Sequence, residues 1–192
     1  MGKMIYCVTT SLDGFVADEA GHFDWGRPSE EVHAFVNDLV RNAGTLLLGR
    51  KMYETMAIWD IIPTEGTNEA MDGPSAAMND YAGIWRAAKK IVYSTSLPVV
   101  TIANATLERS FDPNAIQKAM AETDKDFDIG GPHLAAQAIK AGLVDEYHQF
   151  IVPVLIGGGT YWLPKDVKIE LELTDVRRFD NGFVHLGWRA KR

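Results

Sequence analysis

Apolar and polar positions follow two periods along the first two thirds of the chain. Residues 4–10 and the unbroken apolar run 45–48 predict β-strands, the second of them covered on both faces. After Ser29, apolar residues recur at spacings of three and four, which predicts an amphipathic helix with Ser29 as its N-cap. Further strands are predicted at 90–93, near 105–110 and at 126–129, with helical patterns before the first of them and on either side of the last.

The pattern changes after residue 142. Three strand patterns, 146–155, 167–174 and 183–190, follow one another without an intervening helix, so neighbouring strands can pair antiparallel. The earlier strands alternate with helices, which is typical of a parallel sheet. We therefore predict an α/β fold that forms one domain over residues 1–192. Its central sheet is mixed and mostly parallel, with an antiparallel C-terminal end and helices on both faces.

Composition narrows the classes of partner. The 192 residues carry a net charge of −7, which disfavours binding to nucleic acid or to an anionic membrane, because such binding depends on basic surface. Cys7 is the only cysteine, so no intrachain disulfide forms, and a reducing compartment, the cytoplasm, is expected. The five histidines show no metal-ligand spacing, so no metal site is predicted.

Three strand-to-helix junctions carry the candidate chemistry. Ligands of open α/β sheets bind outside the carboxyl ends of parallel strands, and predicted strands end at Leu48, Tyr93 and Ile129. Gly130 and Gly131 follow the last of these. Two residues without Cβ let the backbone approach a phosphate at the start of the next helix. The sequence therefore predicts a nucleotide cradle at this edge of the sheet.

Side chains suited to a phosphate follow the other two strand ends. Arg50 and Lys51 can neutralise its charge, and Ser94 and Thr95 offer hydroxyl groups. Each feature alone also has an ordinary structural reading: a solvated basic pair, capping hydroxyls and a glycine turn. Their conjunction in one fold pattern favours a binding site.

Three segments, 47–54, 90–96 and 129–131, are similar in order and spacing to the cofactor segments of the dihydrofolate reductase superfamily. Residues 11–14, 143–146 and 153–159 resemble more closely the branch that contains the reductase domain of bifunctional riboflavin-biosynthesis enzymes. The resemblance covers nearly the whole chain. It implies a three-layer reductase fold, NADPH as cofactor and, commonly, a homodimer.

Carried over to this chain, the resemblance assigns the cofactor contacts. Gly49, Arg50 and Lys51 would hold the 2′-phosphate side of NADPH, Ser94 and Thr95 the adenosine side, and Gly130 and Gly131, with Pro132 and His133 opening the next helix, the pyrophosphate. Arg50 would then favour NADPH over NADH. Met52 stands where dihydrofolate reductases often have a threonine, so one hydroxyl contact to phosphate is lost.

Three carboxyl groups are candidates for the catalytic acid. The stretch 25–31 resembles the Trp, Pro and acidic residue that open the first helix of dihydrofolate reductases, where the acid binds the pterin, and both Glu30 and Glu31 fit that place. Glu31 is the first choice because it lies one turn before Phe35 on the predicted helix. Asp13, just past the first strand, is the second choice, although an aspartate before glycine often only forms a turn.

Two aromatic residues near these acids are candidate substrate contacts. Trp25 precedes the predicted helix and Phe35 lies within it. Aromatic side chains are more often core residues or anchors of a loop. Both readings stay open at this point.

The expected reaction is hydride transfer from NADPH to an imine, or to a carbonyl in equilibrium with one, of a small heterocyclic or sugar-derived substrate. The alternative is a non-catalytic nucleotide-binding or regulatory module on the same fold, because fold does not entail function. A homodimer is expected to form partly through the apolar run 151–156, which is longer than one edge strand should leave in water.

Overall fold

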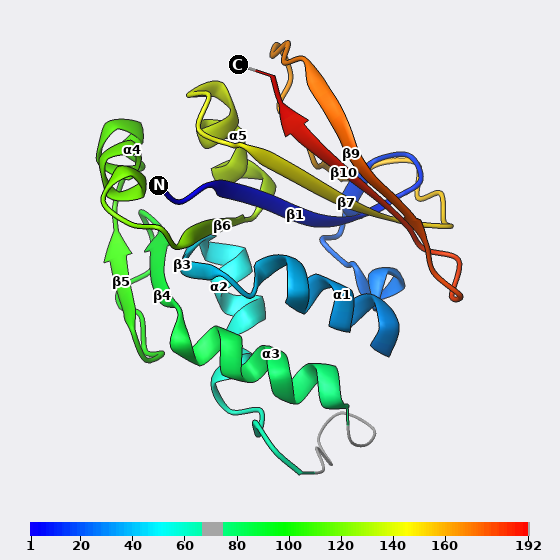
Figure 1. Cartoon of the computed structure of the whole chain (residues 1–192), viewed down its shortest axis with the longest axis horizontal. Helices are drawn as coiled ribbons and strands as arrows, with labels where there is room; N and C mark the ends of the chain where they lie inside the picture. The colour runs from blue at the N-terminus through cyan, green and yellow to red at the C-terminus, as the bar shows by residue number, and fades with distance from the viewer. Residues whose placement is uncertain (67–74, 192) are drawn as a thin grey trace.

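The structure, a computed structural model, describes residues 1–66 and 75–191, and a large β-sheet forms its centre (Figure 1). Within these residues the sheet has eight strands in the order β5-β4-β3-β6-β1-β7-β10-β9. They are β1 (Met4–Ser11), β3 (Ala43–Gly49), β4 (Lys89–Tyr93), β5 (Ala105–Glu108), β6 (Asp126–Gly130), β7 (Glu146–Val152), β9 (Leu171–Arg178) and β10 (Val184–Ala190). A separate pair joins β2 (Phe15–Ala17) to β8 (Thr160–Tyr161).

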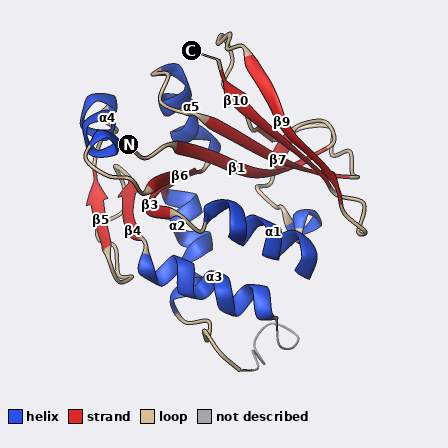
Figure 2. Ribbon diagram, viewed as in Figure 1, coloured by secondary structure: helices blue, strands red, loops and turns tan. Residues whose placement is uncertain are grey.

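Strand direction divides the sheet into two parts. β5, β4, β3, β6, β1 and β7 run parallel, whereas β10 is antiparallel to both β7 and β9. Helices separate the parallel strands along the chain except β4 and β5, while β7, β9 and β10 follow one another without a helix among them (Figure 2). The predicted mixed, mostly parallel sheet with an antiparallel C-terminal end is confirmed.

Helices cover both faces of the sheet (Figure 1). On one face lie α1 (Glu30–Val40), α2 (Arg50–Met56) and α3 (Ala76–Ala87), and on the other α4 (Pro113–Ala121) and α5 (Pro132–Lys140). Leu46 packs with residues of α1, α2 and α3, and its neighbour Leu47 packs with residues of α4 and α5. Because successive strand residues point to opposite faces, β3 is buried on both sides, as its apolar run predicted.

Most of the longer helices begin at a polar side chain. Ser29 caps α1 by accepting a hydrogen bond from the Val32 amide at 3.4 Å, which confirms the predicted cap. Ser75 and Asp112 cap α3 and α4 in the same way. α5 begins instead at Gly131, which has no side chain to accept a bond. In the described part of the chain, no helix is long and apolar enough to cross a membrane.

The expected edge position of the apolar run 151–156 is wrong. β7 ends at Val152 and lies between β1 and β10, with Ile151 paired to Thr10 on one side and to Val184 on the other. The edge strand of this end is β9, on which Leu173 is 56% exposed and Val176 is 59% exposed. Strand order depends on contacts between distant segments, which the local apolar pattern does not encode.

A buried pair of histidines joins the antiparallel end to the parallel part. The Nδ1 atom of His148 lies 3.0 Å from Nε2 of His185, and Nδ1 of His185 lies 2.9 Å from the carboxylate of Asp175. His185 is fully buried. Burial lowers the pKa of His185, and the hydrogen bond to Asp175 opposes that shift only in part.

We expect the stability of the fold to fall as the pH drops below the ordinary imidazole pKa of 6.5. The unfolded chain then binds a proton that folded His185 binds only at lower pH, so acid favours unfolding. His185→Leu should therefore flatten the dependence of the melting temperature on pH in this range. Thermal unfolding of both proteins over a pH series measures it, and equal slopes would contradict the role given to His185.

Candidate cofactor and substrate site

Two of the predicted junctions meet at the carboxyl edge of the sheet. Gly49 ends β3 and Gly130 ends the neighbouring β6, with Leu48 paired to Gly130. A Cβ atom on Gly131 would lie 3.9 Å from the amide nitrogen of Gly49. Gly131 has φ of +96°, a conformation that favours glycine. The glycine pair therefore shapes a close approach of two loops.

The start of α5 adds backbone donors to this edge. The amide of Ala135 bonds to the carbonyl of Gly131 at 2.9 Å and begins the helical ladder. The amides of the first turn that precede it, those of His133 and Leu134, have no earlier helical carbonyl to bond. Pro132 supplies no donor, although its fixed φ suits the first helical position. The His133 side chain is exposed.

Basic and hydroxyl side chains lie along the same edge. Arg50 is exposed and donates to the Ser96 hydroxyl at 3.0 Å and to Glu54 at 2.8 Å. Ser94 is buried, and its hydroxyl accepts the amides of Ser96 and Leu97, so it shapes the turn. Lys51 and Thr95 are exposed. The hydroxyl beside Arg50 is therefore that of Ser96.

Sequence reasoning missed one cation of this edge, Arg109. It directly follows β5, and its guanidinium donates to the carbonyls of Ser94 and Leu97 at 2.9 and 2.6 Å. The side chain thus holds the turn after β4 while remaining exposed. The rule that ligands gather at the carboxyl ends of parallel strands, applied to the weak strand near 105–110, would have found it.

Met52 explains why position 130 is a glycine. A Cβ atom on Gly130 would lie 2.8 Å from Cγ of Met52 and 3.3 Å from Cδ2 of Leu48. Met52, which stands where dihydrofolate reductases often have a threonine, therefore fills the space next to Gly130. Any larger residue at position 130 would displace Met52.

Glu31 and Phe35 connect α1 to the antiparallel end of the sheet. Glu31 accepts a hydrogen bond from Arg177 of β9 at 2.8 Å, and both side chains are 43% exposed. The Arg177 guanidinium lies 4.8 Å above the Phe35 ring. Phe35 also contacts Phe179, with ring centroids 5.5 Å apart. Both residues thus have structural contacts, and their roles toward a substrate stay a prediction.

Glu30 anchors the start of α3. It accepts hydrogen bonds from the Ser75 hydroxyl and, at 2.7 Å, from the Ala77 amide. Partial burial raises the pKa of Glu30, but these hydrogen bonds outweigh it and leave the pKa below its usual range. The carboxylate therefore serves as an acceptor for a helix start.

Asp13 holds a loop near the end of β7. It accepts the amides of Ile156 at 3.3 Å and of Gly157 at 2.8 Å. The Ser11 hydroxyl, and then these amides, lower the pKa of Asp13. The three acids named from the sequence are thus tied to β9, to α3 and to this loop, and their catalytic assignment stays a prediction.

Trp25 lies in a short 3₁₀ helix, η1 (Asp24–Gly26), against β1. A Cβ atom on Gly26 would lie 3.3 Å from the methyl group of Thr9, which places η1 on that strand. Trp25 packs against the apolar cluster of α1 and β7. Its Nε1 atom is buried and has no hydrogen-bond partner among the described residues. Trp25 therefore combines an apolar contact with an unused donor.

Asp128 is the second residue that sequence reasoning missed. It lies in β6 between Ile5 and Leu46 of the adjacent strands, and its Oδ1 atom is buried without a hydrogen-bond partner in the part of the chain described. Burial raises the pKa of Asp128 to about 7. The signal was present: a charged residue within a strand otherwise buried on both faces.

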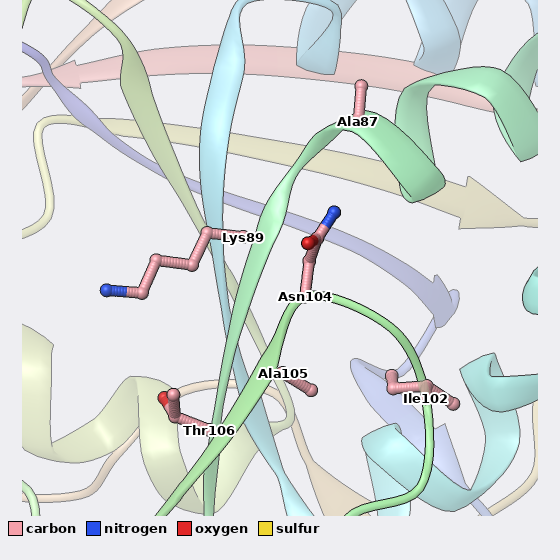
Figure 3. Close-up of a pocket in the computed structure, with 6 residues that line it drawn as sticks. All are labelled: Ala87, Lys89, Ile102, Asn104, Ala105 and Thr106. Atoms are coloured by element: carbon pink, nitrogen blue, oxygen red, sulfur yellow. The ribbon is translucent and has the colours of Figure 1, made fainter.

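A surface hollow of 560 Å³ lies at the opposite edge of the sheet (Figure 3). Its lining is Ala87, Lys89, Ile102, Asn104, Ala105 and Thr106. Lys89 and Ala105 are the first residues of β4 and β5, so the hollow faces the amino ends of these strands and plays no part in the candidate site. Among the described residues, no group of three or more His, Cys, Asp or Glu side chains is arranged to hold a metal ion.

The sequence is similar to a protein family and to one bacterial protein. The family model of the RibD C-terminal domain matches residues 3–185. The uncharacterized protein YyaP of Bacillus subtilis (strain 168) is 26% identical over 195 residues, which is 96% of this chain and 93% of that protein.

Solved structures share the fold. A diaminohydroxyphosphoribosylaminopyrimidine deaminase/5-amino-6-(5-phosphoribosylamino)uracil reductase of Thermotoga maritima superposes with a TM-score of 0.63 at 16% identity, over 99% of this chain and 57% of that one. Dihydrofolate reductase of Enterococcus faecalis, solved as a complex with NADP(H), superposes with a TM-score of 0.60 at 14% identity, over 100% and 98%. The chain therefore has a fold similar to that of dihydrofolate reductase.

Glu30 and Glu31 should differ in what they contribute to stability. Glu30→Ala should lower the free energy of unfolding by about 1 kcal/mol, because the start of α3 loses an acceptor. Glu31→Ala removes an exposed ion pair, typically worth about 0.2 to 1 kcal/mol. Urea denaturation of both variants measures the difference. A larger loss for Glu31→Ala than for Glu30→Ala would mean that the anchor of α3 has been misplaced.

Proposed function

This chain belongs to the RibD C-terminal domain family, and on that premise we propose that it is an NADPH-dependent reductase. It transfers hydride to an imine, or to a carbonyl in equilibrium with one, of a small heterocyclic or sugar-derived substrate. The observation that carries this proposal is the carboxyl edge, where the glycine pair and the start of α5 lie on the same side as Arg50, Ser96 and Arg109.

The residues of this edge fit a dinucleotide phosphate. Gly131 and the first turn of α5 present backbone amides that suit a pyrophosphate. Arg50 and Lys51 carry positive charge suited to the extra phosphate that distinguishes NADPH from NADH. When bound, the cofactor supplies the hydride. The protein then has to orient the substrate, exclude water and provide a proton.

His33 on α1, Tyr81 on α3 and Trp59 form an aromatic cluster against which we propose that a planar substrate packs. The rings of Trp59 and Tyr81 are 4.7 Å apart, and His33 lies 5.4 Å from Trp59. A heterocycle such as a reduced pterin or an aminouracil can pack against such rings. The acidic chain offers no obvious second basic cluster for a ribose phosphate, which favours an unphosphorylated substrate.

The second candidate function is a nucleotide-binding module without turnover. It is favoured by one observation, that Glu31, Glu30 and Asp13 all have structural hydrogen bonds. The two candidates are distinguished by titrating NADPH and following its oxidation with dihydrofolate, 5-amino-6-(5-phosphoribosylamino)uracil and simple cyclic imines. Binding without oxidation across that panel would favour the module. Oxidation with any member would favour the reductase.

Arg50→Ala should remove most of the preference for NADPH over NADH. Loss of a charge-assisted hydrogen bond typically weakens binding by about 1.5 to 3 kcal/mol, and only NADPH carries the phosphate concerned. Calorimetric titration of both nucleotides into the wild type and the variant measures this, with Lys118→Ala on the exposed face of α4 as the control. If the wild type binds both nucleotides equally, Arg50 has no such role.

A homodimer in the cytoplasm remains part of the proposal, now through β9 instead of the run 151–156. The exposed Leu173 and Val176 on this edge strand support it. Val176→Lys should convert the dimer to a monomer, whereas Gln117→Lys, exposed on α4, should not. Light scattering of the eluting protein measures both. A wild-type protein that elutes only as a monomer would refute the dimer.

A further inference from the structure

Asp128 lies two residues before the carboxyl end of β6, close to the edge that forms the candidate cofactor site. Gly130 is two residues further along β6, so the two share a face of the sheet, about 7 Å apart along the strand. That face is the one covered by Met52. Because β3 and β1 pair with β6 on either side, the backbone is covered, and the partial exposure of Asp128 belongs to its side chain. The carboxyl group therefore has one sealed oxygen and one accessible side.

Among the described residues, no ion pair to a cation is found for Asp128, and burial is the cause of its raised pKa. Cys7 of β1 and Tyr81 of α3 are the titratable groups in electrostatic contact with it, and burial, followed by the charge of Asp128, raises the pKa of each. From β3 the paired residue is the apolar Leu46. His33 of α1 contacts the Tyr81 ring, and burial lowers its pKa, which keeps it neutral near pH 7.

We propose that Asp128, with its unpartnered buried oxygen beside Cys7 and Tyr81 and on the face of Gly130, is the catalytic acid of the proposed reduction. The inference rests on the proposed function. Hydride from NADPH forms the new C–H bond at the imine carbon, and the π electrons of the C=N bond move to nitrogen. The Asp128 carboxyl gives its proton to that nitrogen and becomes a carboxylate. Water then returns the proton, and NADP⁺ leaves.

The assignment agrees with the state of the other acids. Asp13 and Glu30 accept backbone amides, and hydrogen bonds hold their pKa values below the usual range. Glu31 is paired with Arg177. A carboxylate whose pKa is held low by hydrogen bonds is a poor proton donor at neutral pH, whereas a donor works best when its pKa lies near the working pH. Of Asp13, Glu30 and Asp128, only Asp128 meets that condition.

The first test measures the protonation of Asp128 directly. Carbon-13 NMR of aspartate-labelled protein should show one carboxyl group that titrates near pH 7, absent in Asp128→Asn and present in Asp124→Asn, an exposed aspartate before β6. Asp128→Asn should also raise the melting temperature relative to the wild type, and by more at alkaline pH than at acid pH. The reason is that deprotonated Asp128 places a charge in a buried position of the folded wild type. Titration together with the surface aspartates would overturn the proposal.

The second test measures the reaction with NADPH and the same panel of dihydrofolate, 5-amino-6-(5-phosphoribosylamino)uracil and cyclic imines. Wild-type kcat/KM should fall as the pH rises through about 7. Asp128→Asn should lower kcat by about 10² to 10⁴ and lose that dependence, with NADPH affinity unchanged, while Asp124→Asn behaves as wild type. Normal turnover by Asp128→Asn would overturn the inference and leave the proposed function intact. No turnover by the wild type would instead reject the reductase itself.

Discussion

The parallel pairing of β6 between β3 and β1 is the constraint on which the rest of the molecule depends. Parallel neighbours end at the same edge, so the loops that follow them meet there whatever their separation in sequence. Gly49 and Gly131 come together for this reason. The same pairing places Asp128 within the sheet, between two strands that remove its backbone from water.

Buried polar groups in this sheet differ in how they are satisfied. Lys90 lies fully buried in β4, with its ammonium 4.9 Å from the Trp85 ring and 3.5 Å from the Ala103 carbonyl. His185 is bonded to His148 and Asp175. Asp128 has no such partner for its Oδ1 among the described residues. A buried, unpaired acceptor costs stability, and such costs are typical of sites where a ligand completes the bonding.

Two acidic residues at the start of α1 match the family pattern but form hydrogen bonds to other parts of the protein. Glu30 and Glu31 are adjacent in sequence but point to different partners, the first turn of α3 and the end of β9. Both interactions tie α1 to segments far along the chain and so fix its position over the sheet. We therefore propose the catalytic acid on β6, because the carboxylates of the helix are already hydrogen-bonded.

The sequence by itself determined the local elements and the strand ends that carry the candidate site residues. Periodicity identified the strand 45–48, Ser29 as a cap and the antiparallel end, because each depends on residues within a few positions of one another. Tertiary structure alone decided that β7 is internal, that the Arg109 guanidinium holds the turn after β4, and that Glu31 pairs with Arg177, 146 residues away. Only packing shows that Oδ1 of Asp128 is buried without a partner among the described residues while the side chain stays partly exposed, since burial depends on neighbours that the folded chain brings together.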